Sequence, residues 1–212
     1  MYKRQGLAEH ASVAAFARFA LELLALGAPA ELVDACTRAM ADEIRHARDC
    51  FALASRYAGA SVGPGPLAMD GVLTGSVDLV AVARSVIAEA CVGETLAAVS
   101  AAVAAEVAHD PEVRRILAGI VLDELRHAEL GWRFIRWALD HASVVERRAI
   151  VLALGDAAVV VRDPDDPPSG SAVVVAHGCL PPATLQRLHY DARHELVAPT
   201  VHALVARPEL RA

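Results

Sequence analysis

The chain has 212 residues, of which 55% are hydrophobic and only 4% aromatic, and its formal net charge is −6. The acidic balance argues against a protein that binds the phosphate backbone of nucleic acids, and no apolar run reaches the roughly 18 residues of a membrane span without a charge or a helix breaker. The four cysteines, Cys36, Cys50, Cys91 and Cys179, lack CxxC spacing, so they indicate neither a zinc knuckle nor a disulfide framework and favour reduced thiols in the cytoplasm.

Alanine, leucine and valine dominate the composition, which favours a helical core of small and aliphatic side chains. The apolar periodicity predicts four long helices before residue 142, at 6–26, 30–57, 77–108 and 111–140. The segment 27–29 (GAP) ends the first of them, and Asp110 is expected to cap the fourth, which begins with Pro111. Residues 1–5 (MYKRQ) resemble translated adapter DNA, so we expect the natural start of the protein, and any signal peptide, to lie elsewhere.

The connections between these helices define their pairing. The segment 59–76 is rich in glycine and proline and joins the second helix to the third, whereas the other two connections are short. Two helical hairpins joined by one long crossover are therefore predicted. Beyond residue 142 we expect two further helices, at 143–161 and 182–206, and a loop between them at 162–171. The predicted organisation is an all-α chain, with a four-helix bundle at 6–141 and a C-terminal helical annex at 142–212.

One charged segment occurs twice, as D-E-I-R-H-A at 42–47 and as D-E-L-R-H-A at 123–128. In each hairpin a glutamate precedes this segment by nearly the same distance. Glu9 precedes Glu43 by 34 residues, and Glu89 precedes Glu124 by 35. An internal duplication that keeps these carboxylates is the simplest explanation.

The repeated glutamates and histidines are predicted to point inward. At about 100° per residue, Glu43 and His46 share the apolar face of their helix, and so do Glu124 and His127. The preceding glutamate of each hairpin lies on the apolar face of its own helix. Four desolvated carboxylates would each cost several kcal/mol if left unpaired, and two divalent cations would neutralise their summed charge of −4. Carboxylate and imidazole ligands suit iron or manganese, whereas calcium prefers oxygen alone and structural zinc brings thiolates.

This pattern resembles that of ferritin-like di-iron carboxylate proteins, in which two helices each give one glutamate and two others each give Glu-x-x-His. It is similar in particular to a bacterial branch with first helices like EHASVAAFARFALELLALGAP. The resemblance covers about residues 6–140 and implies two iron ions, with manganese or a mixed Fe/Mn pair as the alternative. The implied ligands are Glu9, Glu43, His46, Glu89, Glu124 and His127.

The D-E-x-R-H form is similar to that of oxygen-activating members, such as bacterial multicomponent monooxygenases and acyl-carrier-protein desaturases. In those proteins the aspartate orients a metal-bound histidine and the arginine holds the aspartate. The resemblance therefore implies such supporting roles for Asp42, Arg45, Asp123 and Arg126. Cys50 follows His46 by one turn, where the radical subunit of ribonucleotide reductase has a tyrosine, which argues against radical storage.

Glu94 is the alternative to Glu89 as the acidic ligand of the third helix. It lies about 140° from Glu89 on an α-helix. This angle favours a supporting or packing role for Glu94. The alternative that it leaves open is that Glu94 is the ligand in place of Glu89.

The resemblance implies a non-haem di-iron oxidase or oxygenase that activates O₂ and oxidises a small molecule that the sequence does not identify. The bundle is too short to include a reductase module, so electrons are expected from a partner protein or from the substrate. A homodimer is compatible with the sequence. One alternative is a rubrerythrin-like peroxidase or a ferroxidase, although the chain has no rubredoxin-type cysteine quartet. The other is a metal-stabilised helical binding module without enzymatic activity.

Overall fold

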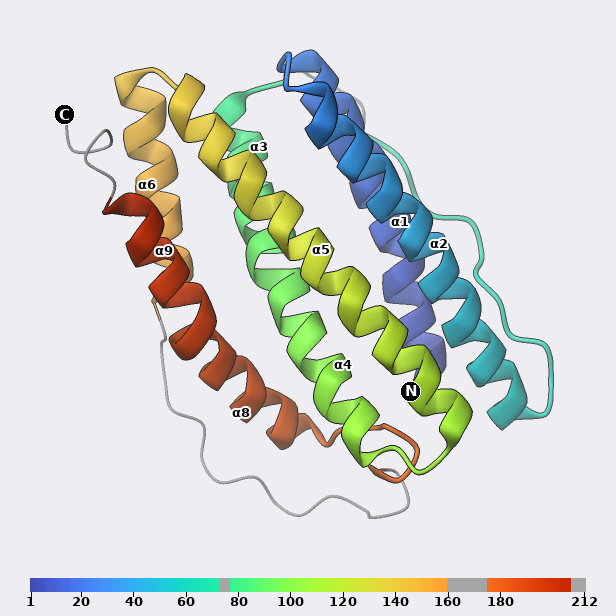
Figure 1. Cartoon of the computed structure of the whole chain (residues 1–212). Coiled ribbons are helices and arrows are strands. Elements are labelled where there is room, and N and C mark those ends of the chain that lie inside the picture. The colour runs from blue at the N-terminus through green and yellow to red at the C-terminus, as the bar shows by residue number, and fades with distance from the viewer. Residues whose placement is uncertain (73–76, 160–174, 207–212) are drawn as a thin grey trace. The chain divides into compact units, whose positions relative to one another are not determined.

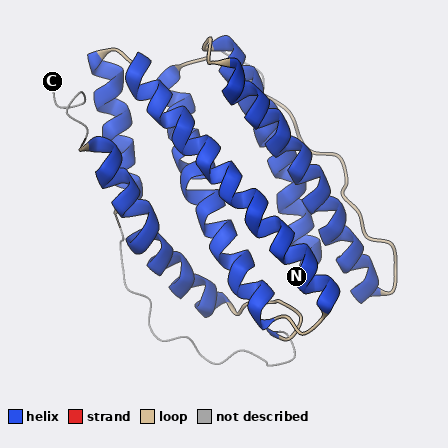
Figure 2. Cartoon of the chain, viewed as in Figure 1, coloured by secondary structure: helices blue, strands red, loops and turns tan. Residues whose placement is uncertain are grey.

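The computed structural model describes residues 1–72, 77–159 and 175–206, and the regular structure within these ranges is helical (Figure 2). This confirms the predicted all-α class for the described residues, while the predicted loop at 162–171 lies outside them. The elements are α1 (Tyr2–Ala25), α2 (Ala30–Ala58), α3 (Leu79–Val86), the π-helix η1 (Ile87–Glu94), α4 (Thr95–Val107), α5 (Pro111–His141), α6 (Val144–Ala158), α8 (Pro182–Ala192), the π-helix η2 (Arg193–Val197) and α9 (Ala198–Val205).

The chain forms two compact units, Met1–Val77 and Asp78–Ala212. The second unit contains the second hairpin together with the C-terminal helices. In that unit α6 packs on α3, η1 and α5, and α8 packs on α4. The boundary expected between residues 141 and 142 therefore falls inside the second unit, because the C-terminal helices share its core.

The first unit is the helical hairpin of α1 and α2, drawn in blue to teal in Figure 1. Gly27 adopts a left-handed conformation at φ +67°, which lets the N–H of Ala28 donate to the carbonyl of Leu23 at 2.9 Å and so closes the end of α1. The helix begins before the predicted residue 6. Tyr2 is buried and stacks on Tyr57 of α2, with 5.8 Å between the ring centroids.

In the second unit α3, η1 and α4 form one continuous helical rod, Leu79–Val107, beside α5 (Figure 1). The carboxylate of Asp78 accepts a hydrogen bond from the N–H of Ala81 at 2.7 Å and caps the start of the rod. Asp110 caps α5 as predicted, because its carboxylate accepts from the N–H of Glu112 at 2.9 Å. Side-chain caps at both helix starts thus satisfy backbone donors that would otherwise lack an intrahelical partner.

The rod Leu79–Val107 is long and apolar enough to cross a membrane, judged by length and composition. Core helices of soluble proteins pass the same test. The rod packs on α5 and α8, and its composition alone does not establish a membrane span.

Candidate metal centre

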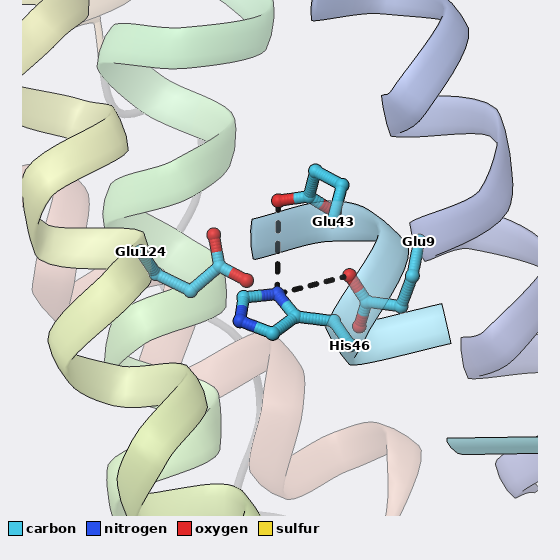
Figure 3. Close-up of side chains that lie close together, drawn as sticks. All are labelled: Glu9, Glu43, His46 and Glu124. Atoms are coloured by element: carbon cyan, nitrogen blue, oxygen red, sulfur yellow. Dashed lines mark ion pairs between the residues drawn. The ribbon is translucent and has the colours of Figure 1, made fainter. Parts of the chain in front are cut away.

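The first unit contains a cluster of two carboxylates and one imidazole. Glu9 comes from α1, while Glu43 and His46 come from one turn of α2, where their i, i+3 spacing directs both side chains to the same side. Each residue offers one ligand atom, and these three atoms lie within 4.8 Å of one another. Nδ1 of His46 is 3.7 Å from Oε1 of Glu43 and 3.9 Å from Oε2 of Glu9, as drawn in Figure 3. Both residues from α2 are 1% exposed.

The second unit contains a cluster of the same composition. Glu124 and His127 lie on one turn of α5, and Glu94 is the last residue of η1. Their three ligand atoms also lie within 4.8 Å of one another. Nδ1 of His127 is 3.3 Å from Oε2 of Glu124, and both residues are buried. Each unit therefore pairs a buried Glu-x-x-His turn with one glutamate from a neighbouring helix.

Glu89 is not in the second cluster, and the prediction that it points inward is wrong. It is exposed, whereas Glu94 is partly buried. The prediction assumed α-helical geometry throughout the third helix, but Ile87–Glu94 is a π-helix, with hydrogen bonds from residue i to i+5. Each residue of such a helix turns the chain by less than the 100° of an α-helix. The directions in which Glu89 and Glu94 point therefore cannot be calculated by continuing the α-helical rotation of α3. Glu94 occupies the place that the sequence analysis gave to Glu89.

The aspartate and arginine of each D-E-x-R-H segment form an ion pair across one helical turn. Nη2 of Arg45 is 2.8 Å from Oδ1 of Asp42, and Arg126 pairs with Asp123 in the same way. Asp123 is buried, while the side chain of Arg126 is 57% exposed. The arginine therefore balances a buried negative charge from the surface. A contact from either aspartate to a histidine stays a prediction.

Cys50 lies in the contact between α1 and α2, one turn after His46. It is 1% exposed. The backbone of α1 comes close to it at Gly6, where an added Cβ would lie 3.3 Å from Cβ of Cys50. The close approach indicates that Cys50 packs the hairpin beside the first cluster.

Gly131 lies near the second cluster and was not predicted from the sequence to have a role there. It follows His127 by four residues and so lies on the same face of α5. A Cβ added to Gly131 would lie 2.8 Å from Cβ of Ala90 and 3.0 Å from the backbone nitrogen of Cys91, both in η1. Glycine is thus what lets η1, which carries Glu94, approach α5 this closely. An isolated glycine in the middle of a helix was the available signal.

The contacts within the second cluster fit side chains that share a metal ion, and those within the first come close to doing so. Two ligand atoms about 2.1 Å from one ion, with about 90–120° between them, lie roughly 3.0–3.6 Å apart. The Nδ1–Oε2 distance of 3.3 Å in the second cluster falls in this range, and the distances of 3.7 and 3.9 Å in the first lie just above it. A direct hydrogen bond between imidazolium and carboxylate would be shorter, at about 2.7–2.9 Å.

Comparison with protein-family models, with curated proteins and with solved structures finds no match to this chain. Function is therefore inferred from the chain's own residues. These form a helical protein with two carboxylate–imidazole clusters, each able to offer three ligands to a metal ion.

Proposed function

We propose that the two clusters together bind two metal ions and that the protein is an oxidoreductase that uses O₂. In this proposal two hairpins form a ferritin-like four-helix bundle, and each supplies one cluster. The first hairpin is α1 with α2, and the second is the rod Leu79–Val107 with α5. The proposed ligands are Glu9, Glu43, His46, Glu94, Glu124 and His127.

The observation that carries the proposal is the repetition of one cluster in both hairpins. A single Glu-x-x-His turn is common on solvated helix surfaces, but here both turns are buried and both have a further glutamate within 4.8 Å of the imidazole. Three ligands from one hairpin leave an ion incompletely coordinated. Four glutamates from both hairpins carry −4, which two divalent ions neutralise, and ligands shared between the hairpins would complete the coordination of both ions in a dinuclear site.

The donor set supports iron or manganese as the metal. Carboxylate oxygens with one imidazole nitrogen per ion suit these metals, whereas a calcium site would contain oxygen alone and a structural zinc site would contain thiolates. When bound, a pair of ferrous ions supplies the electrons and the open coordination positions that O₂ reduction requires. A small organic molecule is the proposed substrate, and a partner protein or that substrate is the proposed electron source.

The chain's own residues hold these ligands in place. Burial of Glu43 and Glu124 keeps bulk water away from the carboxylates and strengthens their interaction with a cation. The ion pair of Asp123 with Arg126 fixes the turn that carries Glu124 and His127. Gly131 allows η1 to bring Glu94 to the same turn.

Anaerobic loading with Fe(II), followed by a pulse of O₂, tests the proposal. We expect O₂ consumption in proportion to bound iron in the wild type, and its loss in the variant Glu124→Ala. Glu129→Ala is the matched control, because Glu129 is an exposed glutamate on the same helix. Two bound irons that do not react with O₂ would show a metal-stabilised binding module instead. Uptake of iron well beyond two ions per chain would show iron storage.

A further inference from the structure

Helix α6 has an apolar stripe on its exposed side. Val145, Leu152 and Val159 follow one another at seven-residue spacing, the last at the C-cap of the helix, and are 80%, 60% and 58% exposed. On the opposite side Ile150 and Leu154 are fully buried in the second unit, where α6 lies beside α9 (Figure 1). The helix therefore has one face in the core and a second apolar face that the described part of the chain leaves exposed.

The exposed face of α6 is symmetric about Leu152. Val145 and Val159 lie seven positions to either side of it, and Arg148 and Asp156 lie four positions to either side. At about 100° per residue these five positions share one face of the helix. Reversing the direction of the helix about Leu152 places valine on valine and exchanges the two charges.

We infer that α6 binds α6 of a second copy of the chain, antiparallel, across a two-fold axis at Leu152. Arg148 then meets Asp156 of the partner subunit, and the two valines of each stripe meet those of the other. In an isologous interface every such contact occurs twice. Ala149 and Gly155, three positions to either side of the axis, present little side chain and allow the helix axes to approach closely.

The charges favour a second copy in this orientation. Neither Arg148 nor Asp156 has an opposite charge three or four residues away on its own helix, whereas exposed Asp34 and Arg38 of α2 form an ion pair across one turn. A parallel arrangement of two α6 helices would bring arginine against arginine. The antiparallel arrangement alone gives each arginine an acidic neighbour.

The extent of the stripe indicates the strength of the dimer. From Val145 to Val159 it runs about 21 Å along the helix. Stable interfaces bury roughly 1,200–2,000 Å² in total, and a single helix pair of this length lies at or below the lower end. We therefore expect a reversible dimer with a dissociation constant on the order of micromolar.

Cysteine cross-linking tests the position of the axis. The four native cysteines are buried, so an introduced thiol is the one that reacts. We expect Leu152→Cys to form a covalent dimer under mild oxidation at least about tenfold faster than Leu122→Cys, because a residue on a two-fold axis meets its own copy. Leu122 is the matched control, since this leucine of α5 is 62% exposed. Equal rates for the two variants would overturn the inference.

Charge reversal tests the orientation. Arg148→Asp and Asp156→Arg should each weaken dimerisation about tenfold in sedimentation experiments, since each replaces two attractive contacts by two repulsive ones. The double variant should restore the wild-type dissociation constant. A double variant that dimerises no better than the single variants, or a wild-type chain that remains monomeric at every concentration, would contradict the inference.

Discussion

The close approach of η1 to α5 gives the sharpest prediction about stability. In Gly131→Ala the new Cβ would lie 2.8 Å from Cβ of Ala90 and 3.0 Å from the backbone nitrogen of Cys91. Both neighbours are buried residues of η1, and one of the two atoms is a backbone atom, so backbone has to move. Overpacking of this kind costs about 3 kcal/mol at the upper end of its range, and the better helix propensity of alanine offsets about 1 kcal/mol. The free energy of unfolding should therefore fall by about 2 kcal/mol.

Thermal and urea unfolding, followed by circular dichroism, measure this change. Gly119→Ala is the matched control, because Gly119 lies on the same helix and its added Cβ would meet no atom within 4 Å. The control should be more stable than the wild type by about 0.4–1 kcal/mol. Gly131→Ala should lower Tm by about 4–8 °C. If both alanine variants are equally stabilised, the close approach of the two helices does not exist.

Three further predictions concern single side chains. Burial, and after it the charge of Arg193, lowers the pKa of His189. The folded state therefore binds fewer protons than the unfolded state, so the contribution of neutral His189 to stability is fully present above about pH 6.5 and is lost as the pH drops below it. The fall in stability should be smaller in His189→Gln. The urea midpoint should therefore fall more between pH 7.5 and pH 5 in the wild type than in His189→Gln. Equal changes in the two proteins would contradict this. Burial raises the pKa of the Cys36 thiol to about 12, so iodoacetamide should label it at pH 8 only after unfolding, and rapid labelling of the native protein would contradict its burial. Ser143 and Glu146 form a capping box at the start of α6, so Ser143→Ala should cost about 1 kcal/mol of stability in urea unfolding, and an unchanged midpoint would show that the cap is not needed.

The helix limits could be predicted because local chemistry sets them. The carboxylate of Asp110 and the ring of Pro111 favour the start of α5 in any context, and Gly27 stops α1 because glycine tolerates a positive φ. The inward turns of Glu43 and Glu124 also followed from sequence, because an i, i+3 pattern within one α-helix needs no tertiary information.

The position of Glu94 could not be predicted, because tertiary packing decides the geometry of η1. The segment 87–94 (IAEACVGE) has no local signal that separates a π-helix from an α-helix, and the α-helix is the favoured default. The π-helix forms where η1 packs on α5 at Gly131, a contact between residues about 40 positions apart. Glu89, in the same π-helix, is exposed.

The number of metal ions per chain tests the central claim most directly. After anaerobic equilibration of the full chain with Fe(II) and removal of free metal, we expect elemental analysis to give two ions per chain. Glu94→Gln should lower the occupancy, whereas Glu89→Gln should leave it unchanged, since Glu94 lies in the second cluster and Glu89 is exposed. A wild-type chain that retains no metal, or a loss of metal in Glu89→Gln but not in Glu94→Gln, would contradict the account.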